Sequence, residues 1–150
     1  MALVKLVHLL SIVIWVGGMF FAYMVLRPSA ASILQPPERL TLWNDVFRRL
    51  FKWVWLTSIG VVLSGLLMIH LLGGMGAVAL PIHIMMLLGI VMLGIYTYVF
   101  FGQYRPFSHA VAAQDWKQAG TILATIRKLI HANLMIGLSI IFVVELGNLF

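Results

Sequence analysis

The sequence has no cysteine and very little charge. Of its 150 residues, ten are Lys or Arg and four are Asp or Glu, so 9% are charged, against about a quarter in a soluble domain. Without cysteine the chain has neither a disulfide framework nor a thiolate zinc site. Hydrophobic residues make up 63%, and so short a chain has too small an interior to bury them all. These scarcities exclude an ordinary soluble enzyme and predict that lipid solvates the chain.

Four long apolar runs account for this composition. They lie at about residues 3–26, 53–72, 80–101 and 129–149. Each reaches the roughly 20 residues that a helix needs to cross a bilayer. We therefore predict an all-α, polytopic membrane protein, a single four-span domain over residues 1–150 that forms a four-transmembrane-helix bundle. The first run is longer than a signal-peptide core and is followed directly by Arg27, which favours a retained span over a cleaved signal.

Basic residues are distributed unevenly around these spans. Nine of the ten lie in two polar connections, Arg27–Lys52 and Gly102–Lys128. The positive-inside rule places these connections in the cytoplasm, and therefore both termini and the Gly73–Ala79 turn on the outer side. Topology thus explains the net charge of +6, and no nucleic-acid partner is expected. The predicted location is the bacterial inner (cytoplasmic) membrane, with the lipid bilayer as the main partner.

Both polar connections have an amphipathic pattern. Leu40–Phe51 and Ala110–Ile126 contain apolar residues at helical spacing beside basic ones. We predict two basic amphipathic cytoplasmic connections, which either lie as helices at the inner headgroup level or extend the following spans.

Ionisable residues inside a span are costly and are candidates for a functional site by default. The topology places four of them, from four different helices, in the outer third of the bilayer: His8, His70, His83 and Glu145. A fifth, His131, lies near the inner face. Trp15 and Gly18 share one helical face with His8, which predicts a small and polar stripe that faces the bundle interior.

The leading hypothesis is a b-type haem protein. Imidazoles that face one another across a helical bundle hold haem iron from both sides, and we expect His8 and His83 to be this pair, with His70 as a substitute ligand or a hydrogen-bond partner. Trp15 and Gly18 would lie against the haem. The protein would exchange electrons with a membrane-soluble partner such as a quinone or a porphyrinogen, with Glu145 as the catalytic proton acceptor. Under this hypothesis it is a haem-dependent oxidoreductase.

Two alternatives remain open. The first is a copper carrier or channel, because imidazole and thioether both suit Cu(I). Its metal ligands would be His8, His70, His83, Met75 and Glu145 on the outer side, and the stations of the inner exit would be His131 and Met135. Most of the nine methionines are interpreted as packing residues, with Met75 and Met85 nearest the outer histidines. The second alternative is an accessory subunit of a larger complex. Small residues at 60–64 and 89–94 would also suit a homo-oligomer.

Short motifs in three spans carry a family resemblance. They are KLVHLLSIVIWVGGM at 5–19, FRRL at 47–50 with SGL at 64–66, and IRKL at 126–129 with the following Asn133 and Gly137. In these motifs the chain resembles the copper-resistance protein D (CopD) family and, more distantly, HemJ-type protoporphyrinogen oxidases. The resemblance implies an inner-membrane protein of copper handling or of haem-dependent redox chemistry, and it implies roles for His8, Trp15, Gly17, Gly18 and His83. A lysine common to the third-span motif of these families is absent here, so its role is not transferred.

Overall fold

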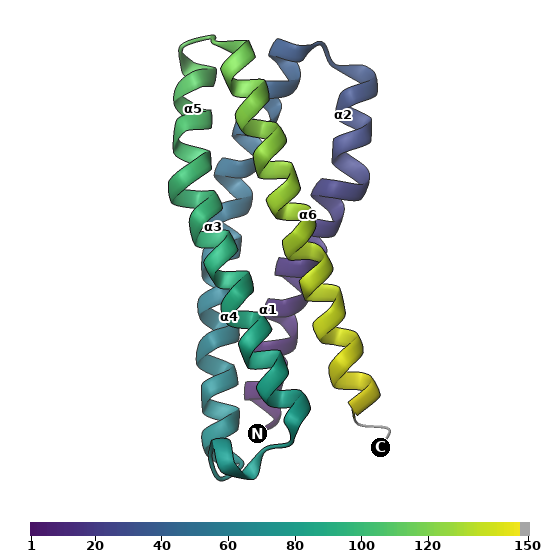
Figure 1. Ribbon diagram of the computed structural model, residues 1–150, viewed down its shortest axis with the longest axis vertical. Helices are drawn as coiled ribbons and strands as arrows, with labels where there is room; N and C mark the ends of the chain where they lie inside the picture. Colours follow the sequence, from purple (N-terminus) through teal and green to yellow (C-terminus); the bar gives the residue numbers. More distant parts are fainter. Residues whose placement is uncertain (148–150) are drawn as a thin grey trace.

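A computed structural model of the chain describes residues 1–147 and shows four long helices that run up and down in turn (Figure 1). The first consists of α1 (Ala2–Phe20), η1 (Phe21–Leu26) and α2 (Arg27–Ile33), the second of α3 (Pro36–Leu71), the third of α4 (Leu80–Tyr98), η3 (Val99–Tyr104) and α5 (Arg105–Ala112), and the fourth of α6 (Trp116–Gly147). A short helical turn, η2 (Met75–Ala77), joins α3 to α4. No strand occurs in residues 1–147, and all four helices are long and apolar enough to cross a membrane. The predicted all-α, four-span fold is confirmed.

The two ends of the bundle differ in composition. The start of α1, the end of α6 and η2 lie at one end, which we call the terminal end, and α2 and α5 lie at the other, which we call the basic end (Figure 1). Both basic amphipathic connections are helical at this basic end. They are continuous with the following spans, because α3 begins at Pro36 and α6 begins at Trp116. Of the two arrangements expected from the sequence, the structure thus has early extensions rather than separate helices along the headgroups.

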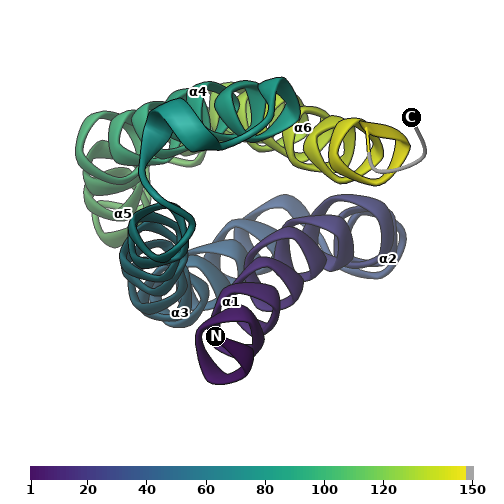
Figure 2. The same cartoon turned by 90° about the horizontal axis from the view of Figure 1, so that it is seen from below.

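The bundle has two layers, which Figure 2 shows end-on. One layer is α1 packed on α3, and the other is α4 packed on α6. A cluster of buried and half-buried aromatic rings joins the layers in the basic half: Trp43, Phe47, Phe51, Trp55, Tyr96, Phe100, Tyr104 and Phe107. Within it the Tyr96 hydroxyl donates a hydrogen bond of 2.9 Å to the Phe51 carbonyl, which ties α4 to α3.

Close contact between α1 and α3 depends on small residues. A Cβ added at Gly60 would lie 2.6 Å from Ser11 Oγ, and one added at Gly65 would lie 3.4 Å from His8 Cε1. The small residues at 60–64 therefore pack inside the chain, where the sequence had suggested a surface for association with other subunits. For that stripe, the expectation of an outward-facing association surface is wrong.

Two π-helical segments sit at matching places in the first and third helices. Phe21–Leu26 and Val99–Tyr104 are each followed directly by an Arg-Pro pair. Proline lacks an N–H and its ring crowds the preceding turn, so the wider π-helical turn accommodates it within a continuous helix. The same local solution at both places indicates that the chain repeats one pattern.

Other residues follow the same repeat. His8 stands thirteen residues before the first π-helical segment, and Met86 stands thirteen residues before the second. The sequence Leu-Leu-x-Ile-Val follows each of them, at 9–13 and at 87–91. We call residues 2–71 the first repeat and residues 80–147 the second repeat. Both run in the same direction through the bundle, as in parallel repeats related by an axis along the membrane normal.

Candidate functional site

A cavity lies between the two layers in the terminal half of the bundle. Its volume is about 320 Å³, and side chains from α1, α3, α4 and α6 line it. Among the described residues that line it, His8 is the only ionisable one. Trp15, which is 5% exposed, lines its inner end and packs edge-on against Tyr96 with ring centroids 6.1 Å apart.

A hydrogen-bond network orients His8. Its Nδ1 lies 2.9 Å from Ser64 Oγ, and the Ser64 hydroxyl donates its proton to the Gly60 carbonyl. Because a hydroxyl has one proton, its oxygen must accept from His8 Nδ1–H. This assignment leaves a lone pair on Nε2, which is the form of imidazole that binds a metal.

Three methionines line the same cavity from α4. These are Met85, Met86 and Met92. Met86 occupies the position in the second repeat that His8 occupies in the first, so equivalent positions of the two repeats line one cavity. From the sequence only Met85 of these three is expected near the outer histidines, whereas Met86 and Met92 are expected to be packing residues. Two signals were present in the sequence, the seven-residue spacing from Met85 to Met92 and the repeat itself.

His83 and Gly18, which were also predicted to belong to the site, lie outside the cavity lining. His83 is half-buried, and its Nδ1–H donates to the Ala79 carbonyl at 3.2 Å. It precedes Met86 by three residues and thus lies on the same face of α4, one turn nearer the terminal end. Gly18 lies against α3 instead, because a Cβ there would be 3.2 Å from Leu50 Cδ1.

The remaining predicted ligands are exposed. His70, Met75 and Glu145 lie at the terminal end outside the cavity lining, and His131 stacks on Tyr23 with ring centroids 4.6 Å apart. Over the described residues, no group of three or more His, Asp or Glu is placed to hold a metal ion. The predicted outer ligand set is therefore not gathered into one centre, and the roles of these residues stay predictions.

The donor atoms around the cavity fit Cu(I) better than they fit a haem iron held by two histidines. Haem held from both sides by histidine needs two imidazoles at one cavity, and the described lining supplies one. An imidazole with three thioethers is instead a soft donor set of the kind that suits Cu(I). The residues present thus fit copper and do not provide the His8 and His83 pair of the haem hypothesis.

Two smaller cavities continue toward the basic end. A cavity of about 20 Å³ adjoins Trp15 and contains Asn133, whose Oδ1 is buried without a hydrogen-bond partner among the described residues. A third, of about 10 Å³, shares Ile130 with the second and is lined by Tyr23, Arg27 and Arg127. The three cavities therefore succeed one another along the bundle axis.

Comparisons with known proteins give one match. A family model described as Copper resistance protein D matches residues 44–146, which is more than half of the chain. The matched residues include most of α3 and reach through α6, whereas α1 with His8 lies before them. No curated protein and no solved structure matches the chain.

Proposed function

The chain belongs to the copper resistance protein D family, and from this premise we propose that it is a copper-handling membrane protein whose cargo, Cu(I), binds in the cavity between the two repeats. One observation carries the proposal: an imidazole and three thioethers line one apolar cavity. The haem hypothesis gains no support from this family, and the HemJ-type resemblance has no match of its own.

His8 Nε2 would supply the nitrogen ligand, and Met86 would supply a sulfur ligand from the equivalent position of the other repeat. Met85 and Met92 add further thioethers. The described lining contains no carboxylate, and an apolar site without an anion favours the singly charged, softer Cu(I) over Cu(II).

The cavities along the bundle axis suggest a route for the cargo. Copper would approach from the terminal end, where His83 stands one turn before Met86. Trp15 lines both the main cavity and the smaller one around Asn133, so its ring must move before an ion can pass. We infer that the main cavity holds the ion and that Trp15 controls its passage toward the basic end.

Titration of purified protein with Cu(I), under reducing conditions and against a colorimetric chelator, tests the site. We expect one tightly bound Cu(I) per chain. His8→Ala and Met86→Leu should each weaken binding by at least tenfold, since each removes a metal ligand. The matched controls are His70→Ala and Met135→Leu, which change exposed residues outside the cavity.

Equal Cu(I) affinity of His8→Ala and the unmutated protein would contradict the site. If cells that express His8→Ala accumulated as much copper as cells that express the unmutated protein, a role of this site in copper transport would be contradicted. A preparation from haem-sufficient cells with a Soret band would restore the haem hypothesis.

A further inference from the structure

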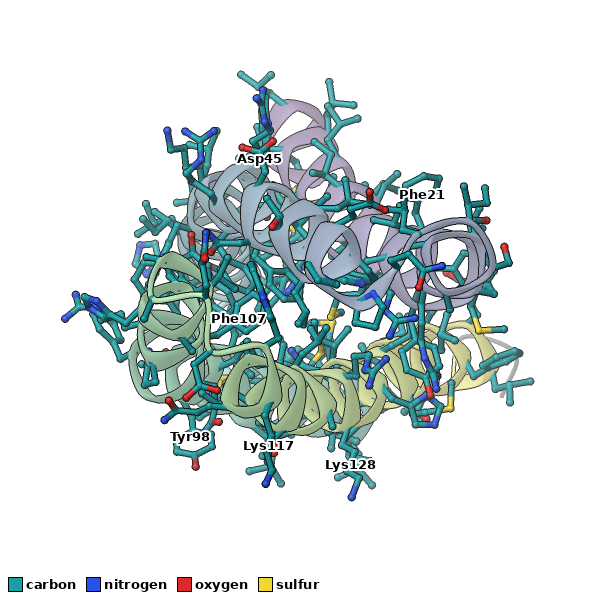
Figure 3. The ribbon with its side chains drawn as sticks, turned by 90° about the horizontal axis from the view of Figure 1, so that it is seen from above. Phe21, Asp45, Tyr98, Phe107, Lys117 and Lys128 are labelled. Atoms are coloured by element: carbon teal, nitrogen blue, oxygen red, sulfur yellow. The ribbon has the colours of Figure 1, made fainter. Side chains whose placement is uncertain are left out.

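Three arginines approach one another at the basic end, away from the copper cavity. Arg27 and Arg127 line the same small cavity, and both are half-buried. Arg39 and Arg27 lie within electrostatic range of Arg127. In Figure 3, side-chain nitrogen atoms gather between α2 and α6, whereas Lys117 and Lys128 point away from the bundle. Positively charged groups that lie this near one another repel, and an anion bound between them would remove the repulsion.

The acidic residues of the chain do not neutralise this cluster. There are four, and Asp45 pairs with Arg48 and, at 2.8 Å, with Arg49. Glu38 and Asp115 accept hydrogen bonds from backbone N–H groups at the starts of α3 and α6. The fourth lies at the terminal end. Over residues 1–146 no ion pair involves any of the three arginines, so their charge is uncompensated.

The two repeats place one arginine in the same way. The guanidinium of Arg27 lies 4.9 Å from the centre of the Tyr23 ring, and that of Arg105 lies 4.9 Å from the centre of the Phe101 ring. Both arginines immediately follow their π-helical segments. The aromatic ring thus holds the guanidinium at a defined place in each repeat.

The repeats differ in how they balance the second arginine. Arg48 and Arg127 begin the equivalent sequences Arg-Arg-Leu and Arg-Lys-Leu. Asp45 stands three residues before Arg48 and neutralises it, but Ala124 stands three residues before Arg127. The carboxylate is therefore missing from the repeat whose arginine lines a cavity with Arg27.

We propose that Arg27, Arg39 and Arg127 bind an oxyanion of the phosphate type, from a phospholipid headgroup or a soluble phosphate compound. Guanidinium groups match the geometry of phosphate oxygens, and basic pockets between membrane helices bind anionic headgroups. The cavity of about 10 Å³ has room for one oxygen atom, so the phosphorus would lie at its mouth. This site is independent of the copper proposal.

Thermal unfolding in detergent tests the site with three probes: an anionic phospholipid, a zwitterionic phospholipid and inorganic phosphate. We expect the anionic phospholipid or inorganic phosphate to raise the Tm of the unmutated protein. The double variant Arg27→Gln/Arg127→Gln should weaken the binding of that anion by roughly tenfold or more, since it removes two charged hydrogen-bond donors. The matched control, Arg48→Gln/Arg105→Gln, removes the same charge from equivalent positions of the repeats and should keep the shift.

The probes separate the two sources. A shift with the phospholipid alone supports a headgroup, and a shift with inorganic phosphate supports a soluble compound. Equal shifts in both double variants, or no shift of the unmutated protein with either anion, would overturn the proposal. If the double variant Arg27→Gln/Arg127→Gln does not fold, native mass spectrometry of the unmutated protein and of Arg127→Gln replaces the unfolding experiment. The unmutated protein should then retain more of the bound anion than Arg127→Gln, and equal retention by the two would overturn the proposal.

Discussion

At the scale of single residues, a hydrogen bond to Ser64 holds the imidazole of His8 in place. Ser64 is 5% exposed and accepts from His8 Nδ1–H while it donates to the backbone. Partners of this kind fix the tautomer of a metal-binding histidine and the direction of its ring. The sequence predicts for Ser64 only a place in a family-like motif and in the small residues at 60–64, because its contact with His8 joins residues that are 56 apart in the sequence.

Ser64→Ala removes this partner without touching the imidazole. We expect Cu(I) affinity to fall by roughly 10- to 100-fold, the usual cost of losing such a hydrogen bond. The measurement is the same chelator competition.

Ser58→Ala is the matched control for this variant, since Ser58 is also buried in α3 but donates to the Trp55 carbonyl. If both serine variants bound Cu(I) like the unmutated protein, the orienting role of Ser64 would be refuted.

Some residues that line the cavity can be predicted from the sequence, and others cannot. His8 and Trp15 were predicted to face inward, and both are buried at the cavity. The predicted outer ligands His70 and Glu145 are exposed, because depth along a helix does not determine which side of the helix a residue occupies. Met86 was overlooked because methionine is also a common packing residue.

At the scale of helices, α1 and α3 pack closely against each other at the level of His8. Gly60 meets Ser11, and one turn further along α3 Ser64 meets His8. Without a hydrophobic driving force in lipid, such close packing of small residues is what holds membrane helices together. The position of His8 therefore depends on the α1–α3 crossing.

Gly60→Ala should disrupt this crossing. The added Cβ would lie 2.6 Å from Ser11 Oγ, so the helices must separate, at a cost of about 1–3 kcal/mol of unfolding free energy. Unfolding in mild detergent by heat or by denaturing detergent gives the measurement.

Gly94→Ala provides the comparison, since no atom lies within 4 Å of a Cβ at that position of α4. Its greater helix propensity should keep or slightly raise stability, by about 0.5–1 kcal/mol. A Gly60→Ala protein as stable as Gly94→Ala would show that the contact is not tight in solution.

At the scale of the whole molecule, two repeats form one cavity between them. Each repeat is a helical pair, and the aromatic cluster joins the pairs only in the basic half. In the terminal half the layers enclose the cavity that His8 and Met86 line. Neither repeat lines this cavity alone, and in many membrane transporters the binding sites likewise lie at the interface between repeats.

The absence of cysteine makes the predicted orientation easy to test. Gly76→Cys and Ala113→Cys each introduce one thiol into an exposed turn, at the terminal end and at the basic end. The cells are first treated so that the reagent passes the outer membrane while the cytoplasmic membrane stays intact. A membrane-impermeant maleimide should then label Gly76→Cys, and it should label Ala113→Cys only after the cytoplasmic membrane has been permeabilised.

The inverse labelling pattern would place the basic end outside and overturn the positive-inside assignment. It would leave the fold itself unaffected, because both orientations keep the start of α1 and the end of α6 at the same end of the bundle.

The sequence by itself determined that this is a four-span helical membrane protein with a basic end. Hydrophobic length and the placement of charge are local properties, and lipid acts on each span independently. Tertiary structure alone decided which histidine lies inside, which methionines join it and which arginines lack a counter-ion among the described residues. Those outcomes depend on helix rotation and on how distant segments meet: Gly60 packs against Ser11, and Arg27 and Arg127 line one small cavity. Rotation about a helix axis is set by packing against neighbouring helices, and that packing exists only in the assembled bundle.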